Sequence, residues 1–335
     1  MRLILIVLSI CLTGLSCKSK KESAEFFARG NFHFKQQEYD RAEHFFSEAI
    51  RKDPHLADAY NNRGLIYLHQ GAWEKAGADF EEAVRLDKTF TEARLNLARL
   101  YTETGRAGEA QPLLKELETR LDTSATFHNV YGQNWVLLNH FREGESHFSR
   151  ALELDSDHVE ALTNLAYVKT VNHAYAEAEQ LLERALALSP DFVFALNNRA
   201  VLYGLDKQWD RAIGLLKKGE QAEPNNLTVV NNLALFYLES GRLVEGREKV
   251  VRGEKLDETS AYTRRNRAVL LLREGNAAGA LEILKKVEMD YPETDHIYYY
   301  LGQAYEASGN RTEACKHYQI GQKLKDPWTE GKCTS

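Results

Sequence analysis

The sequence predicts an all-α solenoid built from nine units, each a pair of helices joined by a short turn. Three observations support this fold class. A period of 34 residues runs from residue 23 to residue 328 without insertion or deletion, some positions in the period are small in every unit, and glycine and proline recur where helices end. The units start at residues 23, 57, 91, 125, 159, 193, 227, 261 and 295, and residues 329–335 form a C-terminal tail.

Small residues predict where the two helices of a unit meet. Position 8 of each unit is glycine or alanine throughout: Gly30, Gly64, Ala98, Gly132, Ala166, Ala200, Ala234, Ala268 and Gly302. Position 20 is also always small, and position 24 is always bulky: Phe46, Phe80, Leu114, Phe148, Leu182, Leu216, Val250, Leu284 and Tyr318. We expect the residue at position 24 to fill the space that the small residues leave.

Glycine and proline predict the turns. Five units carry glycine between their two helices (Gly71, Gly105, Gly241, Gly275 and Gly309), and four carry proline just after the second helix (Pro54, Pro190, Pro224 and Pro292). Pro112 lies inside a predicted second helix, near its start, where backbone N–H groups are mostly free. We expect a local distortion there and no break.

This pattern resembles the tetratricopeptide repeat over residues 23–328. The resemblance implies a right-handed superhelix in which each unit contacts mainly its neighbours and the first helices line an inner groove. It also implies a non-enzymatic scaffold or adaptor that binds a protein partner, whose identity the sequence does not reveal. The match is incomplete, since His33 and Lys169 replace the aromatic residue common at position 11.

The amino terminus predicts export. Arg2 precedes an apolar run, Leu3 to Leu15, which is shorter than the roughly 20 residues that span a bilayer. We interpret residues 1–16 as a signal peptide, with a permanent single-span anchor as the alternative. Cys17 after small residues resembles a bacterial lipoprotein cleavage site, although Gly14 stands where leucine is usual. The interpretation is a protein of the bacterial cell envelope, lipidated on Cys17 and tethered by residues 17–22; a secreted or periplasmic protein is the alternative.

Composition and motifs argue against other classes of function. The formal charge of −6 and the pI near 6.0 give no basic surface for nucleic acid. No phosphate-binding loop, HExxH helix or nucleophile elbow is present, so we expect no enzyme, no cofactor and no small-molecule substrate. The histidines are scattered through the period, and we predict no metal site.

Asparagine marks the predicted groove. Ten of the eighteen asparagines occupy positions 5 and 6 of the units, although asparagine is a poor helix former. Position 6 carries Asn62, Asn96, Asn164, Asn198, Asn232 and Asn266. One interpretation is a ladder whose amides bind the backbone of an extended peptide, as in long members of the family that the repeats resemble; the other is that these amides join neighbouring units.

Two features of the chain ends leave alternatives open. Phe27, Phe34 and the tyrosines 298–300 are aromatic residues of the terminal units. They allow a second function, a rigid spacer or self-assembling scaffold that acts through its ends. Cys315 and Cys333 can pair if the compartment is oxidising, or stay as free thiols.

Overall fold

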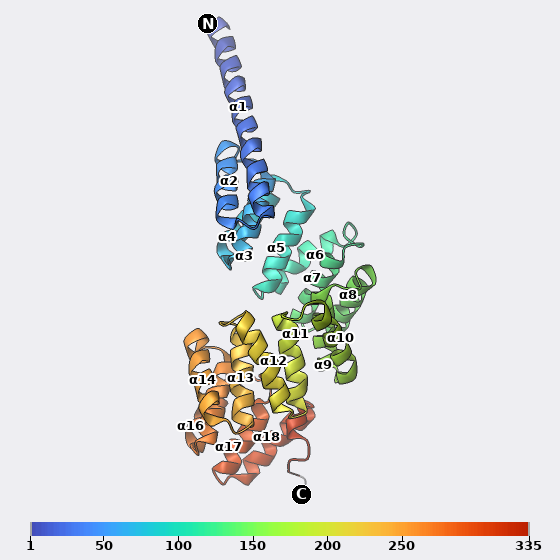
Figure 1. The fold of residues 1–335 in the computed structure, drawn as a ribbon, viewed down its shortest axis with the longest axis vertical. Helices are drawn as coiled ribbons and strands as arrows, with labels where there is room; N and C mark the ends of the chain where they lie inside the picture. Colours follow the sequence, from blue (N-terminus) through green and yellow to red (C-terminus); the bar gives the residue numbers. More distant parts are fainter. Residues whose placement is uncertain (1, 334–335) are drawn as a thin grey trace. The chain divides into compact units, whose positions relative to one another are not determined.

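The computed structural model describes the backbone of residues 2–333 and the side chains of residues 19–333. Throughout this part of the chain, regular structure is helical: eighteen α-helices and one short 3₁₀ helix, with no strand. The helices divide between two compact units, Met1–Ser156 and Asp157–Ser335 (Figure 1). Consecutive helices pair, and the predicted all-α tetratricopeptide-like solenoid is confirmed.

The first unit consists of four helix pairs. They are α1 (Arg2–Lys35) with α2 (Tyr39–Lys52), α3 (Ala57–His69) with α4 (Trp73–Leu86), α5 (Thr91–Glu103) with α6 (Ala107–Leu117), and α7 (Ala125–Leu137) with α8 (Phe141–Leu154). Helix α6 continues through Pro112 without a break, as expected, and it is the shortest helix of this unit.

The second unit consists of five helix pairs and the C-terminal segment. The pairs are α9 (Val159–Val171) with α10 (Tyr175–Leu188), α11 (Val193–Leu205) with α12 (Trp209–Ala222), α13 (Leu227–Glu239) with α14 (Leu243–Asp257), α15 (Ala261–Arg273) with α16 (Ala277–Asp290), and α17 (Ile297–Ala307) with α18 (Arg311–Lys323). The 3₁₀ helix η1 (Pro327–Thr329) follows α18.

Seven of the nine predicted repeat starts are the first residue of a helix, from α3 to α15. The other two differ. The first repeat begins inside α1, and the ninth first helix begins at Ile297, two residues after the predicted start at 295. The ninth start is later because Thr294 donates a hydrogen bond to the Tyr291 carbonyl oxygen at 2.8 Å and His296 adopts a left-handed conformation, with φ of 59°.

Helix α1 includes the residues predicted as a tether. Residues 19–22 are helical and contact α2: the Ser19 hydroxyl donates to the Lys52 carbonyl oxygen at 2.6 Å, and the Lys52 ammonium pairs with Glu22. The predicted signal peptide and Cys17 lie outside the residues whose side chains are described. From residue 19 to residue 333, no helix combines the length and apolar character needed to cross a membrane.

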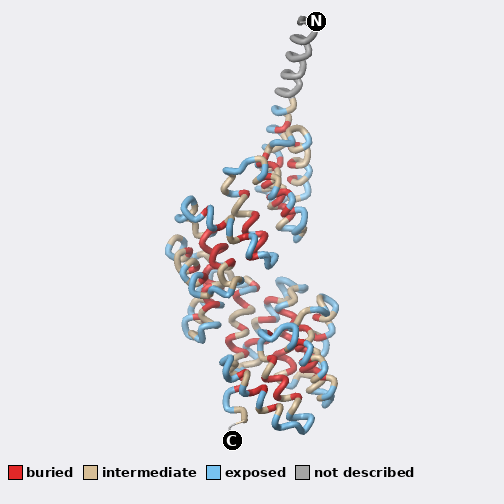
Figure 2. Tube along the Cα trace, turned by 180° about the vertical axis from the view of Figure 1, so that it is seen from behind, coloured by how far each residue is buried: buried red, intermediate tan, exposed pale blue. Residues whose placement is uncertain are grey.

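Two kinds of residue pair form the core between the helices of a repeat. Where position 8 is glycine, position 24 is aromatic: Gly30 with Phe46, Gly64 with Phe80, Gly132 with Phe148, and Gly302 with Tyr318. Where position 8 is alanine, position 24 is leucine or valine: Ala98 with Leu114, Ala166 with Leu182, Ala200 with Leu216, Ala234 with Val250, and Ala268 with Leu284. A Cβ on Gly64 would lie 2.7 Å from Phe80 Cε1, so the aromatic ring occupies the space of the missing methyl group. Figure 2 shows buried residues recurring along the helices and exposed residues at the turns.

The turn between the two helices of each repeat has one conformation. The residue at position 15 has positive φ in all nine repeats, and five of these residues are the glycines named above, with φ between 70° and 83°. The other four are Gln37, Asn139, His173 and Lys207, with φ between 56° and 62°. Glycine adopts this conformation without steric cost, whereas other L-residues are strained in it.

Candidate functional site

The predicted asparagine series lies on the first helices of the repeats. Asn62 lies in α3, Asn96 in α5, Asn164 in α9, Asn198 in α11, Asn232 in α13 and Asn266 in α15. Asn266 is completely buried and the other five are half-buried. The series is therefore set into the contact between helices, with part of most side chains open to solvent.

Most of these amides donate to the preceding first helix. Asn96 Nδ2 donates to Asn61 Oδ1 at 2.8 Å, and Asn232 Nδ2 donates to Asn197 Oδ1 at 2.8 Å. Asn266 Nδ2 reaches the Asn231 carbonyl oxygen at 2.8 Å. Similar bonds join Asn62 to Asn31 and Asn198 to the Thr163 carbonyl oxygen. These bonds account for much of the asparagine enrichment, because each satisfies an amide while joining two repeats.

The same bonds restrict how the series can bind a peptide. The amide nitrogens of five members are already occupied, and the oxygens of Asn62, Asn198 and Asn266 also accept from neighbouring side chains. In the described part of the chain, the Oδ1 atoms of Asn96 and Asn232 receive no hydrogen bond. Binding by the series stays a prediction, and the geometry leaves it chiefly to amide oxygens that accept peptide N–H groups.

Charged groups on the first helices of the second unit are largely paired within the chain. Glu239 accepts hydrogen bonds from Arg273 and from the Tyr300 hydroxyl, the latter at 2.9 Å. Arg265 is only 1% exposed, and its guanidinium donates to Asn266 Oδ1 and to the Asp295 carbonyl oxygen. These groups therefore join α13, α15 and α17, and most of their charge is used within the chain.

Three large aromatic residues remain open on the first helices of the second unit. Tyr167 of α9, Phe194 of α11 and Tyr262 of α15 are 44%, 59% and 41% exposed. Burial nevertheless raises the pKa of Tyr167 and raises that of Tyr262 to about 12, and the carboxylate of Asp295 adds to both shifts. We name Tyr167, Phe194 and Tyr262 the aromatic row.

Sequence reasoning did not identify the aromatic row, because it located the groove by the asparagine series and considered aromatic residues only in the terminal units. Phe194 and Tyr262 both occupy position 2 of their units, so aromatic residues at that position were the signal that could have identified them. Apolar residues of the first helices differ in exposure. Leu235, Leu238 and Val269 are buried in the core, and Leu137 is exposed.

The C-terminal segment packs against the second unit. Trp328 is 3% exposed, its ring is stacked on His296 with centroids 3.8 Å apart, and it meets Trp209 of α12 edge-on at 5.6 Å. It also contacts Tyr299 and Tyr300 of α17. The two tyrosines are buried, so they are not available as an end surface for self-assembly.

A disulfide and polar bonds hold this segment in place. Cys315 and Cys333 form a disulfide, with Cα atoms 5.4 Å apart. Gln322 donates to the carbonyl oxygens of Thr329 and Lys332, and His296 Nδ1 lies 2.8 Å from Asp326 Oδ1. Residues 326–333 are thus part of the folded second unit.

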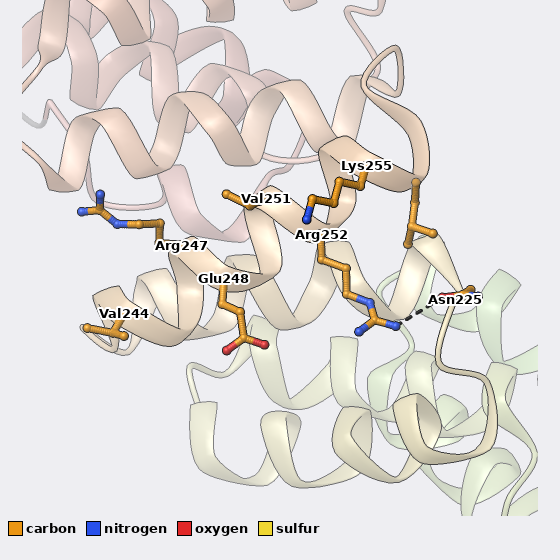
Figure 3. Close-up of a pocket in the computed structure, with 8 residues that line it drawn as sticks. Asn225, Val244, Arg247, Glu248, Val251, Arg252 and Lys255 are labelled. Carbon is orange, nitrogen blue, oxygen red and sulfur yellow. Dashed lines mark hydrogen bonds between the residues drawn. The ribbon is translucent and has the colours of Figure 1, made fainter.

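A cavity of about 740 Å³ lies on α14 (Figure 3). Its lining residues are Asn225, Val244, Arg247, Glu248, Val251, Arg252, Lys255 and Leu256. All but Asn225 come from α14, and Arg252 donates to Asn225 Oδ1 at 3.2 Å. Because one helix supplies nearly the whole lining, this is an open helix surface and not an enclosed ligand site. Among the residues described, no three His, Cys, Asp or Glu side chains gather as a metal site.

Comparisons with known proteins agree with the helix pairs. Two family profiles, each described as tetratricopeptide repeat, match the sequence, one at residues 27–89, 138–191 and 264–325 and the other at residues 67–133. A search of curated proteins finds no match.

Solved structures share the fold at low sequence identity. The crystal structure of the APC/C hetero-tetramer Cut9-Hcn1 contains a chain 12% identical, with a TM-score of 0.62 over 90% of this chain and 73% of that one. TTC0263, a thermophilic TPR protein in Thermus thermophilus, is 21% identical, with a TM-score of 0.50 over 54% of this chain and 99% of its own. YrrB, described as a TPR protein with an unusual peptide-binding site, is 21% identical, with a TM-score of 0.44 over 56% of this chain and 96% of its own.

Proteins built from these repeats generally mediate protein–protein interactions. The first profile alone matches more than half of the sequence, and its matches fall on helix pairs of both units. The chain belongs to the tetratricopeptide repeat family.

Proposed function

We propose that this protein is a non-enzymatic adaptor of the bacterial cell envelope, which binds a segment of a partner protein on the first helices of Asp157–Ser335. The observation that carries the proposal is the aromatic row. Tyrosine and phenylalanine dominate the energy of protein interfaces because they bury a large area at a small cost in conformational entropy. Three such residues left open on first helices favour a protein partner over a purely structural role.

The asparagine series supplies a polar contribution to the same surface. Asn232 lies in α13, between the helices that carry Phe194 and Tyr262, and its Oδ1 receives no hydrogen bond in the described part of the chain. An extended peptide crossing these helices can donate a backbone N–H to this oxygen while its side chains contact the aromatic row. This arrangement recognises a backbone together with apolar side chains, without a catalytic step.

Site-specific photo-crosslinking in the native host tests this proposal. A photoreactive phenylalanine analogue at position 194 or 262 is expected to form a discrete adduct with a partner. The matched control places it at Met289, which is 75% exposed on the second helix α16. Adducts of equal yield and identity at all three positions, or none at 194 and 262, would contradict the proposal.

Anchoring through Cys17 is a separate part of the proposal. It is supported by the apolar leader and by the cysteine that follows its small residues. Metabolic labelling with an alkyne fatty acid is expected to label the wild-type protein and to fail for Cys17→Ser. Labelling that survives this substitution would remove the lipid anchor from the proposal and leave the aromatic row as the binding surface.

The alternative, a spacer or self-assembling scaffold, needs exposed ends. Phe32 of α1 is 60% exposed, which gives the first repeat an apolar surface, while the last repeat is covered by its own C-terminal segment. Sedimentation velocity over a hundredfold range of concentration separates the two functions. A monomer throughout supports the adaptor, and concentration-dependent growth supports the scaffold.

A further inference from the structure

The first unit contains a cavity of about 350 Å³ between its third and fourth repeats. Its walls come from α6 and the residue after it, from α7 and from α8. They are Gln111, Lys115, Glu118, Tyr131, Trp135, Glu143, Ser146 and His147. Tyr131 and Trp135 are joined in the lining by six polar or charged side chains, so the cavity suits a polar or charged group better than an apolar ligand.

Aromatic rings form one side of this cavity. Tyr131 and Trp135 are stacked, with centroids 5.6 Å apart and planes at 22°, and the His147 ring lies 4.4 Å from that of Tyr131. The faces of tyrosine and tryptophan carry negative partial charge, so they attract cations and planar cationic groups.

A second histidine supports this wall from behind. His128 Nε2 lies 3.0 Å from the Asp122 carbonyl oxygen, which only accepts, so this nitrogen carries a proton. The Nδ1 atoms of His128 and His147 lie 3.0 Å apart and share a hydrogen bond, which fixes the His147 ring against Tyr131.

His147 stays neutral at pH 7, since burial and the neighbouring His128 lower its pKa to about 4. Gln111 contributes an acceptor: its Oε1 atom is buried and has no hydrogen-bond partner in the described structure. A buried acceptor without a donor is costly, and a donor brought by a ligand would remove that cost.

Two carboxylates add negative charge. The charge of Glu118 contributes to the raised pKa of Tyr131, after burial, which places this carboxylate near the aromatic wall. Glu143 has only a distant contact, 3.7 Å, with His140. Lys115 is the single cation of the lining and is exposed.

We propose that this cavity binds a guanidinium group, the side chain of an arginine on a partner protein. A guanidinium is planar and cationic and has five N–H donors, so it can stack on Trp135 or Tyr131 while donating to Gln111 Oε1, Glu118 and Glu143. An ammonium group is not planar and has three donors, so it satisfies fewer of these acceptors. The site lies on other repeats than the aromatic row, and it does not depend on the function proposed above.

The test uses the full-length protein labelled with 15N only in tryptophan, so that each of the four indoles gives one N–H signal. The Trp135 signal is assigned with Trp135→Phe. N-acetyl-arginine methylamide is the probe, and the citrulline analogue, of nearly the same shape but uncharged, is the control ligand. We expect the arginine compound to shift the Trp135 signal in a saturable manner and the citrulline compound to bind at least about tenfold more weakly.

Variants connect the shift to the lining. Glu118→Gln and Gln111→Leu are each expected to weaken binding about threefold to tenfold, and Lys115→Gln to strengthen it about twofold to threefold. Glu74→Gln, an exposed acid at the start of α4, is the matched control and should leave the affinity unchanged. The Trp73, Trp209 and Trp328 signals report that each variant is folded.

Three outcomes overturn the proposal. They are equal affinity for the arginine and citrulline compounds, a Trp135 signal that does not move at tens of millimolar probe, and unchanged affinity in a folded Glu118→Gln variant.

Discussion

At the residue scale, the left-handed backbone conformation at position 15 strains some repeats more than others, because only some of them have glycine there. Glycine occupies this left-handed position in five repeats, and Lys207, with φ of 56°, is among the residues that replace it. Steric strain at a lysine in this conformation costs about 1 to 2 kcal/mol of stability. Glycine would remove the strain, but its greater conformational freedom in the unfolded chain would cancel part of the gain.

We therefore expect Lys207→Gly to raise the free energy of unfolding by about 0.5 to 1 kcal/mol. Chemical denaturation followed by circular dichroism measures the change. Asn139→Gly is the matched comparison and should gain less, because asparagine tolerates the left-handed region. A Lys207→Gly variant less stable than the wild type would show that lysine makes contacts that outweigh the strain.

His147 gives a second prediction at this scale, on pH. Its pKa is about 4 in the folded protein, and an unfolded histidine titrates near 6.5. Between these values the unfolded chain binds more protons, so the free energy of unfolding falls as pH drops from about 6.5 to 4.

The size of this effect is about 1 to 2 kcal/mol once the partial exposure of His147 is discounted. Other groups also titrate in this range, so the measurement is the difference between wild type and His147→Gln. That difference should change with pH in the stated window and be constant above pH 7. A pH-independent difference would mean that His147 is charged in the fold, contrary to its burial beside His128.

At the scale of the element, the helix pair depends on the match between positions 8 and 24. Gly64→Ala places a methyl group 2.7 Å from Phe80 Cε1, and we expect a loss of about 1 to 3 kcal/mol. Phe80→Leu makes room for it and recreates the alanine–leucine pair of Ala98 and Leu114.

A double-mutant cycle tests this match. The Gly64→Ala, Phe80→Leu protein should lose less stability than the sum of the single variants, with a favourable coupling of about 1 to 2 kcal/mol. Thermal or denaturant unfolding supplies the four values. Strict additivity would show that the effect of Gly64 on stability does not depend on the Phe80 ring.

The C-terminal segment behaves as an element of the second unit. Trp328→Ala removes a buried indole from contact with Trp209, His296 and Tyr299, so we expect a loss of about 3 to 5 kcal/mol from the repeats it contacts. Hydrogen exchange should show faster exchange in α12 and α17. An unaffected exchange pattern would show that the segment is only loosely held.

The helices could be predicted well from the sequence because the residues that mark their ends recur at the same positions in several repeats. Prolines and glycines recur at the same positions, so one irregular unit does not shift the assignment. The exceptions lie where that repetition stops: the first helix continues on its amino-terminal side, and the start of α17 depends on a local turn at Thr294 and His296.

The candidate site was harder to predict, since it depends on contacts between residues that are far apart in the sequence. The periodicity located Asn232 on a first helix, but it did not show that its amide nitrogen is used by Asn197 of the preceding repeat. The periodicity also did not show that the Asp295 carboxylate raises the pKa of both Tyr167, in α9, and Tyr262, in α15. Contacts between nonadjacent repeats require the folded chain.

At the scale of the whole molecule, stability should be distributed over the repeats, because each helix pair contacts mainly its sequence neighbours. Asp157–Ser335 contains five complete pairs and its own C-terminal segment. We expect this fragment, expressed alone, to be helical and to unfold cooperatively. Circular dichroism with denaturant measures both properties, and a fragment without a cooperative transition would contradict the expectation.

The pairing of positions 8 and 24 also bears on how the length of such an array can change. Gly64 and Phe80 lie within one repeat, and the same holds for every glycine–aromatic and alanine–aliphatic pair. Duplication or deletion of a whole 34-residue unit therefore carries each pair along intact and creates no steric mismatch. The hydrogen bonds and ion pairs between repeats, such as Asn96 to Asn61 and Arg273 to Glu239, must be matched anew at the junction. The packing between the two helices of a repeat is therefore independent of the neighbouring repeats, and whether an added repeat fits depends on its contacts with those neighbours.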